Sequence, residues 1–169
     1  MPLQYSHYTS DKYQIQLQYP SEWTIHEKTN RFVEGPDTLI SNIGAGQIGI
    51  SYASDLLKNF GTVDVQSAVI AFHKSLTTDY THDYRTIENP SFINIDNQRS
   101  GTFLITMKDK YETNSITNVV QYWFTIVGNT GYLIYFISTP EKFDNPENTE
   151  IRDHFIKSIK FLGTNNLTR

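Results

Sequence analysis

The stretch Tyr13–Ile25, YQIQLQYPSEWTI, decides how this chain begins to fold. Aromatic and aliphatic side chains at every second position from 13 to 19 alternate with glutamines. Successive side chains of a strand point to opposite faces, so this alternation predicts a strand with one face on a core. Pro20 has no N–H for a sheet and restricts the residue before it. We therefore expect the strand to stop at Tyr19 and a second strand to resume at Trp23.

The rest of the chain contains further strand patterns separated by turn residues. Gly44-Ala45-Gly46 and Gly128-Asn129-Thr130-Gly131 are short glycine-containing loops of the kind that close antiparallel hairpins. A strand that begins at Tyr84 is interrupted at Asn89-Pro90 and turns back at residues 96–98. The expected strands are 13–19, one from Trp23, a short one at 31–33, 38–43, 47–53, 84–95, 100–107, 116–127 and 132–139.

Two segments have the periodicity of amphipathic helices. The first runs from about Asp64 to Thr78, with apolar residues at steps of three and four and Asp64 as its N-cap. The second follows Pro146 and extends toward Leu162, with Gly163 at its end. In the strand at 116–127 both faces are apolar, which is typical of a sheet covered on both sides. The sequence predicts an α+β sandwich: a largely antiparallel sheet of six to eight strands flanked by two main helices.

Composition limits the number of domains and the kinds of partner. The chain of 169 residues fits one domain spanning 1–169, with residues 1–4 and 163–169 as expected flexible tails. A net charge of -4 argues against a nucleic-acid partner. No run of apolar residues is long enough to predict direct insertion into a membrane. The absence of cysteine excludes disulfides and thiolate chemistry.

Two motifs resemble the PsbP family, the fold of the extrinsic proteins of the photosystem oxygen-evolving complex and of their bacterial and archaeal relatives. One is Y-x-I-x-L-x-Y-P-x-x-W from Tyr13 to Trp23, and the other is F-I-x-S-I-x-F from Phe155 to Phe161. Between them the resemblance covers most of the chain. It implies an extracytoplasmic, non-enzymatic accessory or binding domain with no shared catalytic residues. In photosynthetic members it implies a partner in a membrane complex.

One cluster of side chains could bind a metal ion. Asp79, His82 and Asp83 lie within five residues after the first predicted helix. Carboxylate oxygens and imidazole nitrogens suit calcium, manganese or zinc. The alternative is a solvated polar loop in which His82 interacts with the helix C-terminus, and we favour it. We therefore expect no cofactor, with a divalent cation at these three residues as the alternative.

Other motifs point away from catalysis. The segment 44–49 matches G-x-G-x-x-G, but a strand pattern follows it where a nucleotide-binding site needs a helix, so we interpret it as a hairpin loop. No serine sits on a glycine elbow, and no nucleophile has a base nearby in the sequence. Aromatic residues make up 14% of the chain and could form a recognition surface, although packing is the favoured interpretation.

These observations favour a non-enzymatic accessory domain that binds a protein partner, in some cases within a membrane-associated complex. One alternative is a module that binds a divalent metal or a small ligand, and a weaker one is a hydrolase whose site is assembled from several loops. We expect an extracytoplasmic or cell-surface location with a leader absent from the given sequence, and a cytoplasmic location is the alternative.

Overall fold

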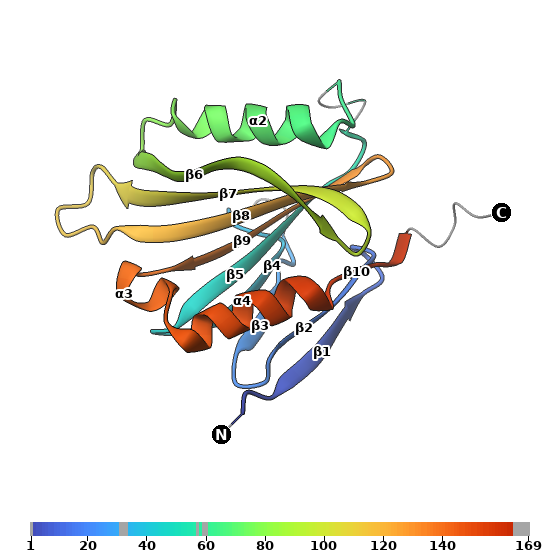
Figure 1. Cartoon of the computed structure of the whole chain (residues 1–169), viewed down its shortest axis with the longest axis horizontal. Helices are drawn as coiled ribbons and strands as arrows, with labels where there is room; N and C mark the ends of the chain where they lie inside the picture. The colour runs from blue at the N-terminus through green and yellow to red at the C-terminus, as the bar shows by residue number, and fades with distance from the viewer. Residues whose placement is uncertain (1, 31–33, 57, 59–60, 164–169) are drawn as a thin grey trace.

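The computed structural model describes residues 2–30, 34–56, 58 and 61–163, and its elements form two sheets and the helices that cover them (Figure 1). The strands are β1 (Tyr5–Ser10), β2 (Ile15–Pro20), β3 (Thr24–Glu27), β4 (Thr38–Asn42), β5 (Gly46–Ala53), β6 (His82–Ile95), β7 (Gln98–Asp109), β8 (Asn118–Val127), β9 (Thr130–Ser138) and β10 (Lys160–Phe161). The helices that can be described in full are α2 (Val65–Leu76), α3 (Pro140–Phe143) and α4 (Pro146–Ser158). None of the described helices has the length and apolar composition needed to span a bilayer.

The main sheet has seven strands in the order β3-β4-β5-β9-β8-β7-β6, and every neighbouring pair is antiparallel. The predicted α+β class and the antiparallel sheet of six to eight strands are therefore confirmed. The hairpin at Gly44–Gly46 joins β4 to β5, as expected. Pro90 lies in β6, an edge strand, where the pairing with β7 shifts register on either side of Glu88. An edge strand tolerates proline because one side of it donates no ladder hydrogen bonds.

A second sheet, β1-β2-β10, was not predicted, and it takes the opening strand out of the main sheet. β2 begins at Ile15 rather than Tyr13, because the chain turns after β1 and Gln14 has a φ of 53°. It also continues to Pro20, where only β1 pairs with it. Pro20 is tolerated there because the other side of β2 is free at that end. The predicted strand at 31–33 lies outside the described residues.

The main sheet is covered on both faces, as the pattern of β8 predicted. Val119, Trp123 and Val127 face the larger core, which α4 and the small sheet close. Val120 faces the smaller core beneath α2. Figure 1 shows α2 and α4 on opposite sides of the sheet. Burial of apolar surface on both faces is the main favourable contribution to the stability of such a sandwich.

The two helices begin where the sequence predicts. Asp64 caps α2 by accepting a hydrogen bond from the Ser67 N–H at 3.0 Å, and Asn145 caps α4 by accepting one from Asn148 at 2.7 Å. α4 ends at Ser158 rather than near Leu162. The residues after it become extended because β10 pairs with β2. β6 likewise begins at residue 82, two residues earlier than predicted, because it pairs with the end of β7.

The opening and closing motifs contact each other. Lys160 and Phe161 pair with Gln16 and Ile15. The Leu162 N–H donates to the Gln14 carbonyl at 2.9 Å. Two further bonds strengthen the closure: Gln18 N–H donates to the Ser158 hydroxyl at 2.8 Å, and Phe161 N–H donates to an Asp96 carboxylate oxygen at 2.8 Å. Ile15, Ile159 and Phe161 are all buried in the larger core.

Close contact between Gly101 and α2 makes a test of the packing. A Cβ on Gly101 would lie 2.2 Å from the Val69 Cγ2 atom, far inside van der Waals contact. We expect Gly101→Ala to lower the free energy of unfolding by about 1–3 kcal/mol, as overpacked cores do. In a Val69→Ala background, which removes the two nearest methyl groups and leaves only the Val69 Cβ at 2.9 Å, the same change should cost less. Urea unfolding of the four proteins measures this coupling. An equal loss of unfolding free energy in both backgrounds would contradict the close contact between Gly101 and Val69.

Candidate functional site

The loops at one end of the main sheet form the candidate site, and we call this region the loop end. Strand pairing defines it, because β6 starts there opposite the last residue of β7, β8 starts there, β9 finishes there, and the β4–β5 turn lies there. It comprises residues 42–46, 77–82, 109–118 and 138–142. Figure 1 shows these turns on the left, with α3 among them. The predicted metal-binding residues lie in the second of these segments.

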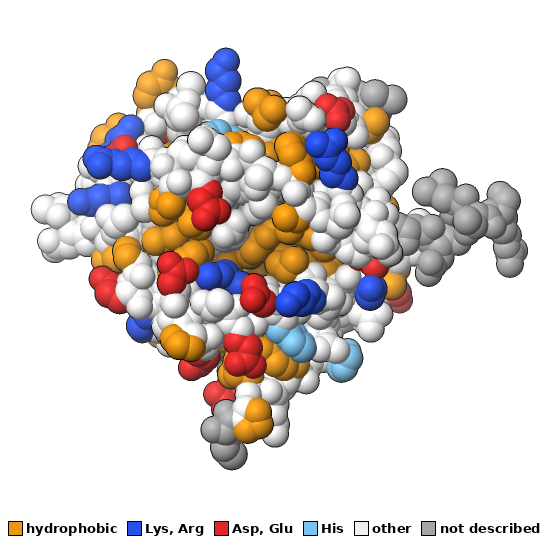
Figure 2. Space-filling view, viewed as in Figure 1, with side chains coloured by type: hydrophobic (Ala, Val, Ile, Leu, Met, Phe, Trp, Pro, Cys, Tyr) orange, Lys and Arg blue, Asp and Glu red, His pale blue; other side chains and the backbone are white. Residues whose placement is uncertain are grey.

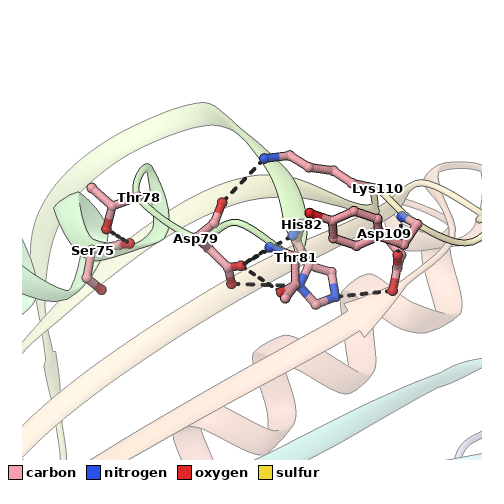
Figure 3. Close-up of polar contacts among 8 residues, drawn as sticks. Ser75, Thr78, Asp79, Thr81, His82, Asp109 and Lys110 are labelled. Carbon is pink, nitrogen blue, oxygen red and sulfur yellow. Dashed lines mark hydrogen bonds and ion pairs between the residues drawn. The ribbon is translucent and has the colours of Figure 1, made fainter.

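Asp79 organises the turn that leads from α2 into β6. Its Oδ1 atom accepts hydrogen bonds from the Thr81 N–H and the Thr81 hydroxyl, both at 2.6 Å, and from the His82 N–H at 3.3 Å (Figure 3). The hydrogen bond from the Thr81 hydroxyl, followed by those from the backbone, lowers the pKa of Asp79 to about 2. The carboxylate thus acts as a fixed acceptor that shapes the turn.

His82 lies between two carboxylates. Its Nδ1 atom is 3.7 Å from Asp79 Oδ2, and its Nε2 atom is 4.0 Å from Asp109 Oδ2 (Figure 3). Asp109 in turn shapes the β7–β8 loop, because its Oδ1 atom accepts N–H bonds from Tyr111 at 2.7 Å and Glu112 at 3.1 Å. These two backbone bonds, that from Tyr111 first, lower the pKa of Asp109. The imidazole therefore links two loops that are far apart in the sequence.

Lys110 adds a second link between the same loops. Its backbone N–H donates to the Thr81 carbonyl at 3.0 Å, and its ammonium group donates to the Asp79 carbonyl at 3.3 Å. Burial, and then the nearby charge of Asp79, raises the pKa of Tyr84 to about 12. The Tyr84 hydroxyl therefore stays neutral at physiological pH. Together these contacts fix the α2–β6 and β7–β8 loops against each other.

Asp83 does not join the other two predicted metal ligands. It follows His82 in β6, so its side chain points to the other face of the sheet. Its carboxylate lies 3.7 Å from the Arg85 guanidinium instead. Asp109, which the sequence did not suggest, takes the place beside His82 because β6 pairs with β7. In the part of the chain that the structure describes, no group of three or more His, Asp or Glu side chains could hold a metal ion.

The hydroxyl closest to His82 is not arranged as a nucleophile. Thr81 Oγ1 lies 2.7 Å from His82 Nδ1, but the same hydroxyl donates to Asp79 at 2.6 Å. A nucleophile needs its proton directed at a base, and here that proton is directed at a carboxylate hydrogen-bonded within its own turn. The arrangement is that of a polar clasp between two loops.

Sequence reasoning missed the exposed apolar side chains of the loop end. Four large residues there present most of their surface to solvent: Ile43 (103% exposed), Tyr80 (83%), Tyr111 (76%) and Ile116 (64%). Tyr80 and Tyr111 flank the polar clasp on its two loops. The remaining large apolar residues with high exposure among the described residues lie elsewhere, as Val63, Ile70, Ile87 and Ile93. The sequence signal that could have indicated them is the presence of large apolar residues within loop segments that are otherwise polar.

Two of these exposed side chains, Ile43 and Ile116, each border one of two adjoining hollows. One hollow, of about 330 Å³, is lined by Ile43, Thr139, Lys142 and Asn118 among others. The other, of about 360 Å³, is lined by Ile116, His82, Asp109 and the same Asn118. Both are shallow and open to solvent. The Lys142 ammonium donates to the Gly44 carbonyl, which ties α3 to the β4–β5 turn.

Charges of both signs are distributed over the molecule. On the face that carries α4, Figure 2 shows acidic and basic side chains interspersed. On this face they form no basic stripe of the kind that binds a phosphate backbone, and the net charge of the chain is -4.

The arrangement of the two sheets and the helices matches solved structures. Cyanobacterial PsbP from Synechocystis superposes with a TM-score of 0.65 at 12% identity, over 95% of this chain and 94% of that one. The chain has the PsbP-like fold. LpqN, described as involved in cell envelope biogenesis of Mycobacterium tuberculosis, has the same arrangement with a TM-score of 0.57 at 10% identity, over 94% and 90% of the two chains. A Bacteroides thetaiotaomicron protein matches at 0.52 and 14% identity, over 88% of this chain and 45% of its own.

No family model matches the chain, and no curated protein matches it in sequence. The identities to the PsbP-like structures are so low that they establish the fold alone. The resemblance stated from the opening and closing motifs is confirmed at the level of fold.

The lowered pKa of Asp79 predicts an acid-sensitive turn. Because the folded pKa of about 2 lies below the ordinary value of about 4, the stabilisation is complete above pH 4 and is lost as the pH falls through 2. Asp79→Asn should lower the free energy of unfolding at pH 7, and the difference from wild type should shrink between pH 4 and pH 2. Denaturant unfolding across this range measures it, with Asp83→Asn as the control. A difference in unfolding free energy that does not change with pH would contradict the lowered pKa of Asp79.

Proposed function

We propose that this protein is a non-enzymatic accessory domain with the PsbP-like fold, which binds a protein partner outside the cytoplasm through its loop end. The observation that carries the proposal is that four large apolar side chains in the loops at one end of the sheet are exposed to solvent: Ile43, Tyr80, Tyr111 and Ile116. Exposed apolar surface of this kind costs solubility, and it commonly marks a contact with another protein.

The chemistry of the loop end suits a protein partner. Tyrosine gives a large contact area at low entropic cost and is enriched where binding energy concentrates. Hydrogen bonds to Asp79 and Asp109 within their turns, and those from Lys110 to the α2–β6 loop, hold the two tyrosine-bearing loops in place. Binding then requires little further ordering of these loops, which favours affinity. Loops presented by a rigid scaffold are a common location for recognition residues.

The location outside the cytoplasm is supported by the fold and by one structural neighbour. LpqN, which has the same fold, is described as involved in cell envelope biogenesis. The absence of cysteine is compatible with an oxidising compartment, although it does not require one.

The role of the loop end can be tested with paired variants. The partner would first be isolated by crosslinking in cells of the source organism, and its affinity for the purified protein then measured. Tyr111→Ser/Ile116→Ser should weaken binding by about thirtyfold or more, because central apolar contacts contribute about 2 kcal/mol or more when truncated. Both side chains are mostly exposed, so the thermal unfolding midpoint should stay close to that of wild type.

The matched control is Ile70→Ser/Ile87→Ser, which removes two exposed apolar side chains of similar size away from the loop end. It should bind as wild type does. Equal affinities for the two double variants would remove the loop end as the interface. Turnover of a substrate by the purified protein would contradict the non-enzymatic role, and recovery of the native protein only from the cytosol would contradict the proposed compartment.

A further inference from the structure

A second feature lies beside α2 and shares no lining residue with the hollows of the loop end. A pocket of about 600 Å³ opens between α2 and strands β5, β8 and β9, on the face of the main sheet that α2 covers. Its volume falls within the range of about 300–1,000 Å³ that is typical of small-ligand sites.

The pocket exists because α2 is held to one side of the sheet. Val69 packs directly on Gly101, which draws the helix over β7. Toward β5 and β9, the facing positions carry small residues, which cannot fill the space beyond the helix. These residues are Ala68 and Ala71 on the helix and Ser51, Ala53 and Gly131 on the strands. The pocket is open to solvent, and its small lining residues leave room for a ligand beside the helix.

The walls of the pocket are apolar. The lining includes the large apolar residues Leu56, Phe72, Phe124 and Leu133. None of the described lining residues is charged. Transfer of an apolar ligand from water into this pocket is therefore favourable. A charged group would have to stay at the mouth, because its burial without a partner costs free energy.

Most of the hydroxyl groups along the rim already have partners within the chain. Thr62 Oγ1 accepts from the Asp64 N–H at 3.0 Å, Ser67 Oγ donates to the Asp64 carboxylate at 2.6 Å, and Ser75 Oγ donates to the Phe72 carbonyl at 2.7 Å. These groups do not require hydrogen bonds from a ligand. Recognition in this pocket therefore depends on shape and apolar contact.

We propose that this pocket binds a single alkyl or acyl chain, with any polar head group left at the mouth. The volume, the apolar walls and the satisfied rim hydroxyls favour this ligand over a polar or charged one. The proposal goes beyond the protein-binding function and is independent of it, because the two sites share no lining residue.

Titration with cis-parinaric acid tests the pocket directly, since the fluorescence of this fatty acid rises in an apolar site. We expect saturable binding at one probe per chain. Dodecanoate and dodecanol should both displace the probe, because the pocket recognises the chain and not the head group. No binding, or displacement by dodecanoate alone, would overturn the proposal.

Two variants locate the site from opposite walls. Ala68→Phe fills the space from the helix, and Leu133→Asp places a carboxylate on the floor, which is only half-buried. Each should weaken probe binding by about tenfold or more. Ile70→Phe, on the exposed side of the same helix, is the control and should bind as wild type does. Wild-type affinity in a folded Ala68→Phe or Leu133→Asp protein, checked by circular dichroism, would exclude this pocket.

Discussion

The closure of the larger core by the two ends of the chain is the contact on which the rest of the structure depends. β10 adds only two residues to the small sheet, yet it places Phe161 in the core and lets α4 lie against β2. Asp96, from the turn between β6 and β7, accepts the Phe161 N–H and so ties the chain end to the main sheet. Without this closure, Ile15 and Phe161 would lose their cover, and burial on that face of the sheet would be incomplete.

The molecule has two separate places for which we propose recognition. At the loop end, short polar contacts hold exposed apolar side chains in position, so rigidity comes from Asp79 and Asp109 and contact area from Tyr80 and Tyr111. Beneath α2, the pocket that we propose for an apolar chain lies beside a close contact between the helix and the sheet. The PsbP-like fold thus presents surfaces that differ in chemistry, which fits a scaffold whose function lies in sites carried on a common architecture.

Sequence patterns predicted the parts of this fold that depend on local periodicity. The strand pattern at Ile15 and Leu17, the cap at Asp64 and the two apolar faces of β8 follow from side-chain spacing alone. The small sheet could not be predicted, because β10 pairs with β2 across about 140 residues of sequence and β1 is rich in polar residues. In the loop end, the proximity of Asp79 and His82 was predictable, whereas Asp109 reaches His82 only through strand register.

Native-state hydrogen exchange tests most directly whether the two chain ends close one cooperative core. The amides of Phe161 and Leu162 donate to Asp96 and to the Gln14 carbonyl, and they should exchange only through global unfolding. Their free energies of exchange should therefore equal that of Ile134, a buried residue of the central strand β9. Fast exchange at Phe161 and Leu162 while Ile134 remains protected would show that the ends open independently, and it would contradict this account.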